Sequence, residues 1–193
     1  MNVQIINLKR KKKAMPNWCE NQLSIYGKKE DMDKFISVIK AGEDEYKLLE
    51  TLYPTPEELS IGDVSMTPDE QQLANQQKFG YKSWYDWRID KWGTKWPESD
   101  LRIAQDYTNR ADDRVEIAFG FDTAWSPPIE AFDKISMDYP NLLFCLYYEE
   151  PGMGFCGKNV WANGESIESY QGDLITDYFD EDYLFEEYIE NNN

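Results

Sequence analysis

The spacing of apolar residues changes from two to about 3.6 along the chain, and this change limits the fold more than any other feature. Residues 20–26 alternate, with Leu23 and Ile25 on one side, which is typical of a half-buried strand. Residues 30–41 then carry apolar side chains at helical spacing and predict an amphipathic helix that ends at Gly42. These two segments form the clearest βα unit in the chain.

The second half of the chain repeats this change of spacing. In order, its predicted elements are strands at 101–108 and 114–121, a helix at 129–139, a strand at 142–148, and a hairpin of 155–162 and 165–170. Without that last hairpin the order is βαββαβ, the split βαβ or ferredoxin-like pattern. The sequence therefore predicts an α+β fold, with an antiparallel sheet, helices on one face and an extra C-terminal hairpin.

Residues 43–99 have a different character and are predicted to be a Trp-rich helical insertion within a single domain of residues 15–170. Two segments, Thr55-Pro56-Glu57-Glu58 and Thr67-Pro68-Asp69-Glu70, resemble helix starts with a Thr cap before a proline. Trp84, Trp87, Trp92 and Trp96 follow, interleaved with Lys and Arg. We expect Trp84 and Trp87 to pack the insertion on the sheet, and Trp92 and Trp96 to be candidate anchors for a protein partner.

The charge balance excludes several classes of function. The chain has 193 residues with 37 Asp and Glu, 20 Lys and Arg, no histidine and a net charge of −17. Without histidine, His-dependent catalytic triads and His-liganded zinc sites are excluded. The negative charge argues against nonspecific binding to DNA or RNA and against binding to anionic membranes, because both require basic surfaces.

The basic residues are concentrated in an N-terminal extension. Residues 1–14 contain five of the 20 basic residues and no acid, so residues 15–193 carry 15 basic and 37 acidic groups, a net charge of −22. One interpretation is a basic tail that binds nucleic acid. We favour the other, that translation starts at Met15 and that the basic run reflects purine-rich codons upstream of it.

Cysteine usage and hydropathy predict a cytoplasmic protein. Cys19, Cys145 and Cys156 are widely spaced and form no CxxC motif, so we expect free thiols in a reducing compartment. No apolar run approaches the ~20 residues of a membrane span. Neither a cofactor nor a bound metal is expected.

A glycine motif and a group of acids are the candidates for chemistry. The segment from Gly152 to Gly157 fits GxGxxG, but a strand follows it where a dinucleotide site requires a helix, so we interpret it as a glycine-rich hairpin or bulge. A second candidate site consists of Asp122, Trp125, Glu149 and Glu150. Because neighbouring residues of a strand point to opposite faces, Glu149 and Glu150 share a site only if a bulge separates them.

The acidic-aromatic C-terminal segment, residues 171–193, is the main predicted binding region. Residues 174–189 include nine large apolar residues in 16 positions, and no basic residue follows Lys158. This pattern is typical of a segment that docks an apolar stripe, on its own domain or on a partner, and displays its carboxylates. The partner-binding candidates are Trp92, Trp96, Asp177, Tyr178, Asp180, Glu181, Asp182, Tyr183, Glu186 and Glu187.

Several motifs resemble a known family. They are Met15-Pro16-Asn17-Trp18-Cys19-Glu20-Asn21-Gln22-Leu23, Trp84-Tyr85-Asp86-Trp87, Trp92-Gly93-Thr94-Lys95-Trp96, Thr123-Ala124-Trp125-Ser126-Pro127-Pro128 and the segment from Tyr148 to Phe155. They resemble the YubB-like group of small phage- and plasmid-encoded proteins, described as having a ferredoxin-like domain. The resemblance implies a mobile-element setting and this fold, and it brings no established chemistry.

These observations predict an interaction protein that is not an enzyme. We expect a phage-type counter-defence protein that inhibits a host nuclease, DNA-modifying transferase or toxin by placing an acidic surface in its basic nucleic-acid groove. A single-stranded nucleic-acid binder that uses the sheet and the Lys/Trp segment is an alternative. A carboxylate-based metal enzyme is a third hypothesis.

Overall fold

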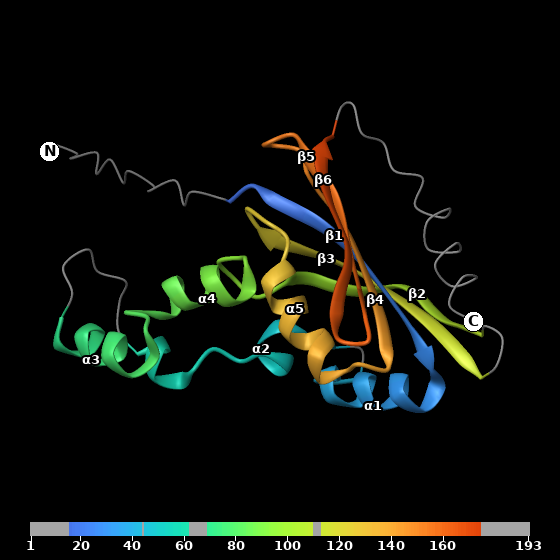
Figure 1. Ribbon diagram of the computed structural model, residues 1–193, viewed down its shortest axis with the longest axis horizontal. Coiled ribbons are helices and arrows are strands. Elements are labelled where there is room, and N and C mark those ends of the chain that lie inside the picture. The colour runs from blue at the N-terminus through green and yellow to red at the C-terminus, as the bar shows by residue number, and fades with distance from the viewer. Residues whose placement is uncertain (1–15, 44, 62–68, 110–112, 175–193) are drawn as a thin grey trace, which may run out of the picture.

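The computed structural model describes residues 16–43, 45–61, 69–109 and 113–174, which form a six-stranded antiparallel sheet with helices against it (Figure 1). The strands are β1 (Trp18–Lys28), β2 (Ser99–Asn109), β3 (Arg114–Ala124), β4 (Leu142–Glu150), β5 (Phe155–Ala162) and β6 (Glu165–Asp173). Their order across the sheet is β2-β3-β1-β4-β5-β6. The first four strands thus have the arrangement of a split βαβ fold, with β5 and β6 added beside β4. The predicted α+β, ferredoxin-like class is confirmed.

Two helices, α1 (Lys29–Ile39) and α5 (Ile129–Asp138), cover one face of the sheet. Phe35 of α1 and Phe132 of α5 are both buried and both contact the ring of Phe144 on β4, with centroids 5.7 and 5.9 Å away. The side chains of β1 that join this main core are alternate residues, such as Leu23 and Ile25. The intervening, even-numbered residues of β1 therefore point to the opposite side, which we call the helix-free face.

Between α1 and β2 the chain forms α2 (Leu49–Leu52), the 3-10 helix η1 (Glu57–Ser60), α3 (Glu70–Phe79) and α4 (Trp84–Trp92). Of these, α4 contacts α5 and so joins the helical layer.

Of the two predicted Thr caps of this region, Thr55 is not used as expected. The 3-10 helix η1 starts after Pro56, and the Thr55 hydroxyl instead accepts a hydrogen bond from Arg88 Nε at 3.0 Å. For α3 the cap is Asp69, whose carboxylate accepts the backbone N–H of the third helical residue at 2.8 Å. The predicted cap Thr67 lies outside the described residues. Asp caps a helix as well as Thr does, so the local signal did not distinguish them.

The glycine motif forms a turn and the start of a strand, as predicted. Residues 151–154 connect β4 to β5, Gly154 has a φ of 76°, and the chain continues as β5. Gly157 lies within β5, where a Cβ atom would be 2.2 Å from the Tyr148 hydroxyl oxygen. The motif therefore serves a tight turn and a close approach between strands.

The edge strand β2 pairs irregularly with β3. Its register shifts three times, between Ser99 and Arg102, between Ile103 and Gln105, and between Gln105 and Thr108. Such bulges twist a strand and interrupt its ladder of hydrogen bonds.

Candidate protein-binding site

Three carboxylates lie in a row across the helix-free face, near the end of the sheet where β1 begins and β3 and β4 end. Glu20 on β1 is directly opposite Asp122 on β3 and directly opposite Glu149 on β4. Neighbouring strands are about 4.8 Å apart, so side chains at paired positions on one face are close neighbours. We call Glu20, Asp122 and Glu149 the carboxylate row. Like charges placed this way repel one another unless a cation lies near them.

The electrostatic effect of this row is clearest at Asp122. Partial burial raises the pKa of the Asp122 carboxyl above its ordinary value, and the charges of Glu20 and Asp100 raise it further. The guanidinium of Arg102 opposes this change in pKa. The row is therefore a place where an added positive charge would be stabilised.

The carboxylate row borders a concavity of about 300 Å³ on the helix-free face. Its lining also includes Gln22, Arg102, Tyr147, Cys156 and Leu174. Carboxylates around an aromatic ring suit an ammonium or guanidinium group, because the ring face attracts a cation as well. The geometry can therefore accept a basic side chain.

Glu150 does not belong to this row, so its place in the predicted second site is wrong. Its side chain is 1% exposed and lies on the opposite face from Glu149, because no bulge separates the two residues. Glu150 accepts hydrogen bonds from the backbone N–H groups of Gly152, at 3.0 Å, and Met153. Its role is to hold the β4–β5 turn.

Three tryptophans lie at the end of the sheet where β1 begins and β3 ends, beside the carboxylate row. The rings of Trp18 and Trp96 are in contact, with centroids 6.3 Å apart, and the Lys95 ammonium lies 4.7 Å from the Trp96 centroid. The backbone N–H of Trp125 donates to the Asn17 carbonyl oxygen at 3.0 Å, one residue before Trp18. We call Trp18, Trp96 and Trp125 the Trp rim.

Trp125 is the most exposed member of the Trp rim and has an unfavourable backbone conformation. Its side chain is 47% exposed and its φ is 75°, in the left-handed region that bulky residues rarely adopt. Such a conformation costs on the order of 1–2 kcal/mol. The surrounding corner holds it, because Thr123 Oγ1 donates to the Ser126 carbonyl oxygen at 2.8 Å.

Trp92 is buried, so its prediction as a partner anchor is wrong. Its side chain is 0% exposed, and its indole N–H donates to the Tyr53 carbonyl oxygen at 2.8 Å. The Arg88 guanidinium lies 4.6 Å from the Trp92 centroid and 5.1 Å from that of Trp84. Arg88 thus packs against tryptophans of the insertion. Trp87 is buried in the main core and Trp84 is half-buried against it, so the interpretation of both as packing residues is confirmed.

The other predicted site residues divide into two groups. Trp96, Asp122, Trp125 and Glu149 lie together at one end of the sheet. The C-terminal candidates Asp177, Tyr178, Asp180, Glu181, Asp182, Tyr183, Glu186 and Glu187 lie outside the described residues.

Sequence reasoning missed Trp18 and Glu20 at this site. Both precede or begin the predicted first strand, and their alternation with Cys19 places them on its polar side. The alternation is visible in the sequence, but it does not reveal which strands pair with β1 or in which register they pair.

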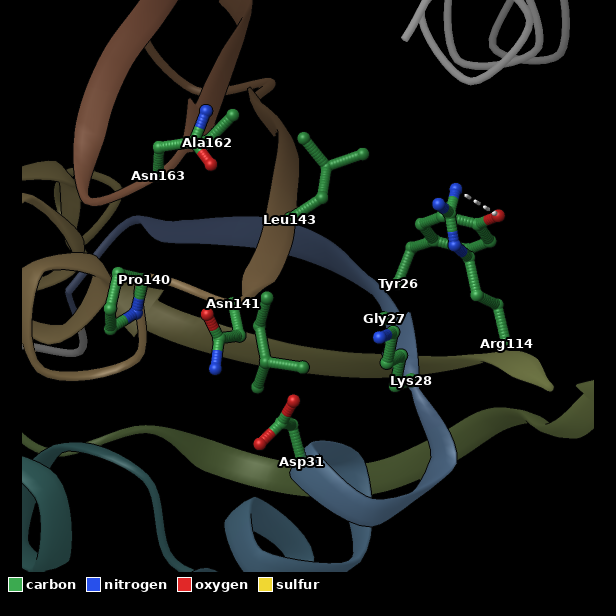
Figure 2. Close-up of a pocket in the computed structure, with 11 residues that line it drawn as sticks. Tyr26, Gly27, Lys28, Asp31, Arg114, Pro140, Asn141, Leu143, Ala162 and Asn163 are labelled. Carbon is green, nitrogen blue, oxygen red and sulfur yellow. Dashed lines mark hydrogen bonds between the residues drawn. The ribbon is translucent and has the colours of Figure 1, made fainter. Parts of the chain in front are cut away.

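A second concavity, of about 420 Å³, lies at the other end of the same sheet and was also not predicted (Figure 2). Figure 2 shows Tyr26 and Arg114 side by side, with Arg114 Nη1 3.5 Å from the Tyr26 hydroxyl oxygen. Lys28 adds a second basic residue and Asp31 an acidic one. This end of the face is less acidic than the carboxylate row.

Metal binding and membrane insertion gain no support from the described part of the chain. Within residues 16–43, 45–61, 69–109 and 113–174, no group of three or more acidic or cysteine side chains is arranged to hold a metal ion. No helix in the same ranges combines the length and the apolar character needed to cross a membrane.

Comparison with known proteins places the fold in a family. A family model described as the ferredoxin-like domain in Api92-like protein matches residues 91–191, just over half of the chain. The crystal structure of a protein api92 from Yersinia pseudotuberculosis is 12% identical, with a TM-score of 0.49, and the match covers 86% of this chain and 100% of that chain. No curated protein matches the chain at a significant level.

Proposed function

Because the chain belongs to the family described as the ferredoxin-like domain in Api92-like protein, we propose a function that this domain's surface supports, namely binding a basic surface of another protein. The observation that carries the proposal is that the carboxylate row lies next to the Trp rim. The protein acts by occupying a basic surface of its partner and catalyses no reaction.

The two features supply different parts of a binding interface. Exposed tryptophans are enriched among the residues that contribute most to protein–protein affinity, and Trp125 is 47% exposed. The φ of Trp125, 75°, is unfavourable for a bulky residue, and such strain is typical of functional positions. The carboxylate row adds steering of a basic partner and specificity.

The finer proposal concerns the partner. The row displays negative charge on a rigid sheet, and the whole chain has a net charge of −17. A groove that binds nucleic acid has the complementary charge, so a nuclease, DNA-modifying transferase or toxin would suit this surface. The resemblance to the YubB-like phage and plasmid group favours a host enzyme of this kind, inhibited as counter-defence in the host cytoplasm.

Direct binding of single-stranded nucleic acid by the sheet is less favoured. Lys158 is on the helix-free face, but it is 1% exposed and its Nζ lies 2.8 Å from Glu168 Oε2. The Lys/Trp segment provides Arg88 and Trp92 for packing rather than for stacking on bases. Both features reduce the surface available to phosphates and bases.

The proposal is tested by charge variants matched in net charge. The site variant is Glu20→Gln/Asp122→Asn/Glu149→Gln, and the control is Glu30→Gln/Asp33→Asn/Asp138→Asn, which removes three acids from the exposed sides of α1 and α5. Each chain is immobilised, exposed to host lysate, and eluted in steps of increasing salt. We expect the site variant to lose the captured partner while the control retains it.

Two further arms identify the type of partner. Trp125→Ala should lower capture, whereas Met137→Ala, at a 63% exposed position on α5, should not. Short duplex DNA added as a competitor should release a partner held through its nucleic-acid groove. Equal capture by the site variant and the wild type would contradict the proposal, and capture insensitive to DNA would contradict its finer part.

A further inference from the structure

The helix-free face carries a second apolar cluster. It consists of Tyr26, Leu143, Cys145, Tyr147, Val160 and Ala162. These six side chains are only 0–8% exposed, and Cys145 is fully buried. An antiparallel sheet commonly leaves one face to water, and side chains on such a face would be much more exposed than these.

None of the described helices covers this cluster. The buried residues of α1 and α5 belong to the main core on the opposite face, together with Leu23, Phe144 and Trp161. The strand β6 does not cover the cluster either, because its side chains from Glu165 to Gln171 are exposed. A two-layer domain with a buried second face requires another layer on that face.

The C-terminal end of the described chain leads onto this face. Leu174 follows β6, its backbone N–H donates to the Gly154 carbonyl oxygen at 2.9 Å, and it lines the concavity with Tyr147 and Cys156. Residues 175–193 follow from there. From Tyr147 to Leu143 the cluster extends about 13 Å along β4, whereas 19 residues span about 28 Å even as a helix.

The composition of residues 175–193 suits a covering layer. Starting from Leu174, the residues Tyr178, Phe185 and Ile189 recur at helical spacing. The segment has seven acids and no base. Basic groups occur at the far end of the face, where Arg114 lies beside Tyr26 and Lys28 lines the same concavity (Figure 2).

We propose that residues 175–193 dock on their own domain as an amphipathic helix over the second apolar cluster. Their apolar side chains form the second layer over this face, and their carboxylates point away from the sheet to solvent. Residues 1–15 are the competing candidate; with five basic residues and no acid, their charge suits the carboxylate row but not the end of the face that holds Arg114 and Lys28. The docking is intramolecular and does not depend on the proposed partner.

The three cysteines provide the test. Cys145 and Cys156 are on the helix-free face, whereas Cys19 is in the main core under the helices, and all three are buried free thiols. The full chain, a chain lacking 175–193 and a chain lacking 1–15 are alkylated, and the rate at each cysteine is measured by mass spectrometry. Loss of 175–193 should accelerate alkylation of Cys145 at least about tenfold and leave Cys19 unchanged.

A second pair of variants is needed if the truncation unfolds the domain, because Cys19 would then be alkylated as well. Tyr178→Asp/Phe185→Asp in the full chain should expose Cys145, and its control Asp177→Asn/Glu186→Gln should not. A synthetic peptide of residues 175–193 should restore protection to the truncated chain. Protection of Cys145 that persists without 175–193, exposure caused by loss of 1–15, or protection that depends on protein concentration would overturn the proposal.

A failure of the docking proposal can be distinguished from a failure of the proposed function. The alkylation assay contains no partner and reports only on the second apolar cluster. The capture assay changes the carboxylate row and the Trp rim, and none of those residues belongs to that cluster.

Discussion

Neutralising Glu20 should stabilise the domain at neutral pH. Glu20 is the central member of the carboxylate row and faces Asp122 on one side and Glu149 on the other. Glu20→Gln keeps the shape of the side chain and removes both repulsions. We expect the free energy of unfolding to rise.

The size of this effect follows from the register. Side chains at directly paired positions are about 5 Å apart, and two unit charges at that distance repel by ~0.8 kcal/mol in water. Glu20 and Glu149 are exposed, so the value for water applies rather than one for a protein interior. Two such neighbours, reduced by side-chain motion and by the nearby Arg102, give an expected gain of about 1 kcal/mol.

The gain should disappear in acid. The pKa of Asp122 is raised by burial first and then by Glu20, so the folded chain holds this proton more tightly than the unfolded chain does. Ionised Asp122 therefore lowers stability above its folded pKa, and this penalty is absent below its unfolded pKa of about 3.9. Glu20→Gln and the wild type should converge as the pH falls to about 4 and below.

Urea unfolding followed by tryptophan fluorescence measures this difference. The matched control is Glu30→Gln on α1, which breaks an exposed ion pair with Lys34 at 2.8 Å and should lower the stability slightly. At about 1 M salt the gain from Glu20→Gln should vanish, because screening shortens the range of charge interactions to about 3 Å. A loss of stability from Glu20→Gln at low salt, or a gain unchanged by salt, would refute the reasoning.

Three further substitutions test the packing of the fold by the same urea assay. Gly157→Ala should cost about 1–3 kcal/mol, because the new Cβ would lie 2.2 Å from the Tyr148 hydroxyl oxygen; an unchanged midpoint would disprove this contact. Trp92→Ala should cost about 3–5 kcal/mol through the lost ring and its hydrogen bond to Tyr53, and a loss under about 1 kcal/mol would mean that Trp92 is exposed. Asp69→Ala should cost about 1 kcal/mol by removing the cap of α3, whereas Asp69→Asn should cost little.

The fold could be predicted because its signals are local. The change from a period of two to 3.6 is visible within single segments, and the predicted helix at 129–139 corresponds to α5 (Ile129–Asp138). The strand order then follows from a common arrangement of βαββαβ chains. No long-range contact had to be known.

The candidate site depends on long-range register, so only part of it could be predicted. Glu20, Asp122 and Glu149 are far apart in the sequence, and a shift of one residue in either pairing would move one of them to the other face. The exposure of tryptophans was equally hard to infer. Trp92 and Trp96 look alike in sequence, but Trp92 ends α4 facing the core and Trp96 follows the helix at the rim of the sheet.

The irregular pairing of β2 has a consequence for the behaviour of the protein in concentrated solution. An open sheet has two outer strands, and a straight outer strand is a template on which another chain can add a strand of its own. The three register shifts in β2 break the regular row of N–H and C=O groups that such growth requires. The other outer strand, β6, carries the charges of Glu165, Glu168 and Asp173. Both borders thus oppose edge-to-edge polymerisation, which leaves the end of the sheet that carries the Trp rim available for recognition.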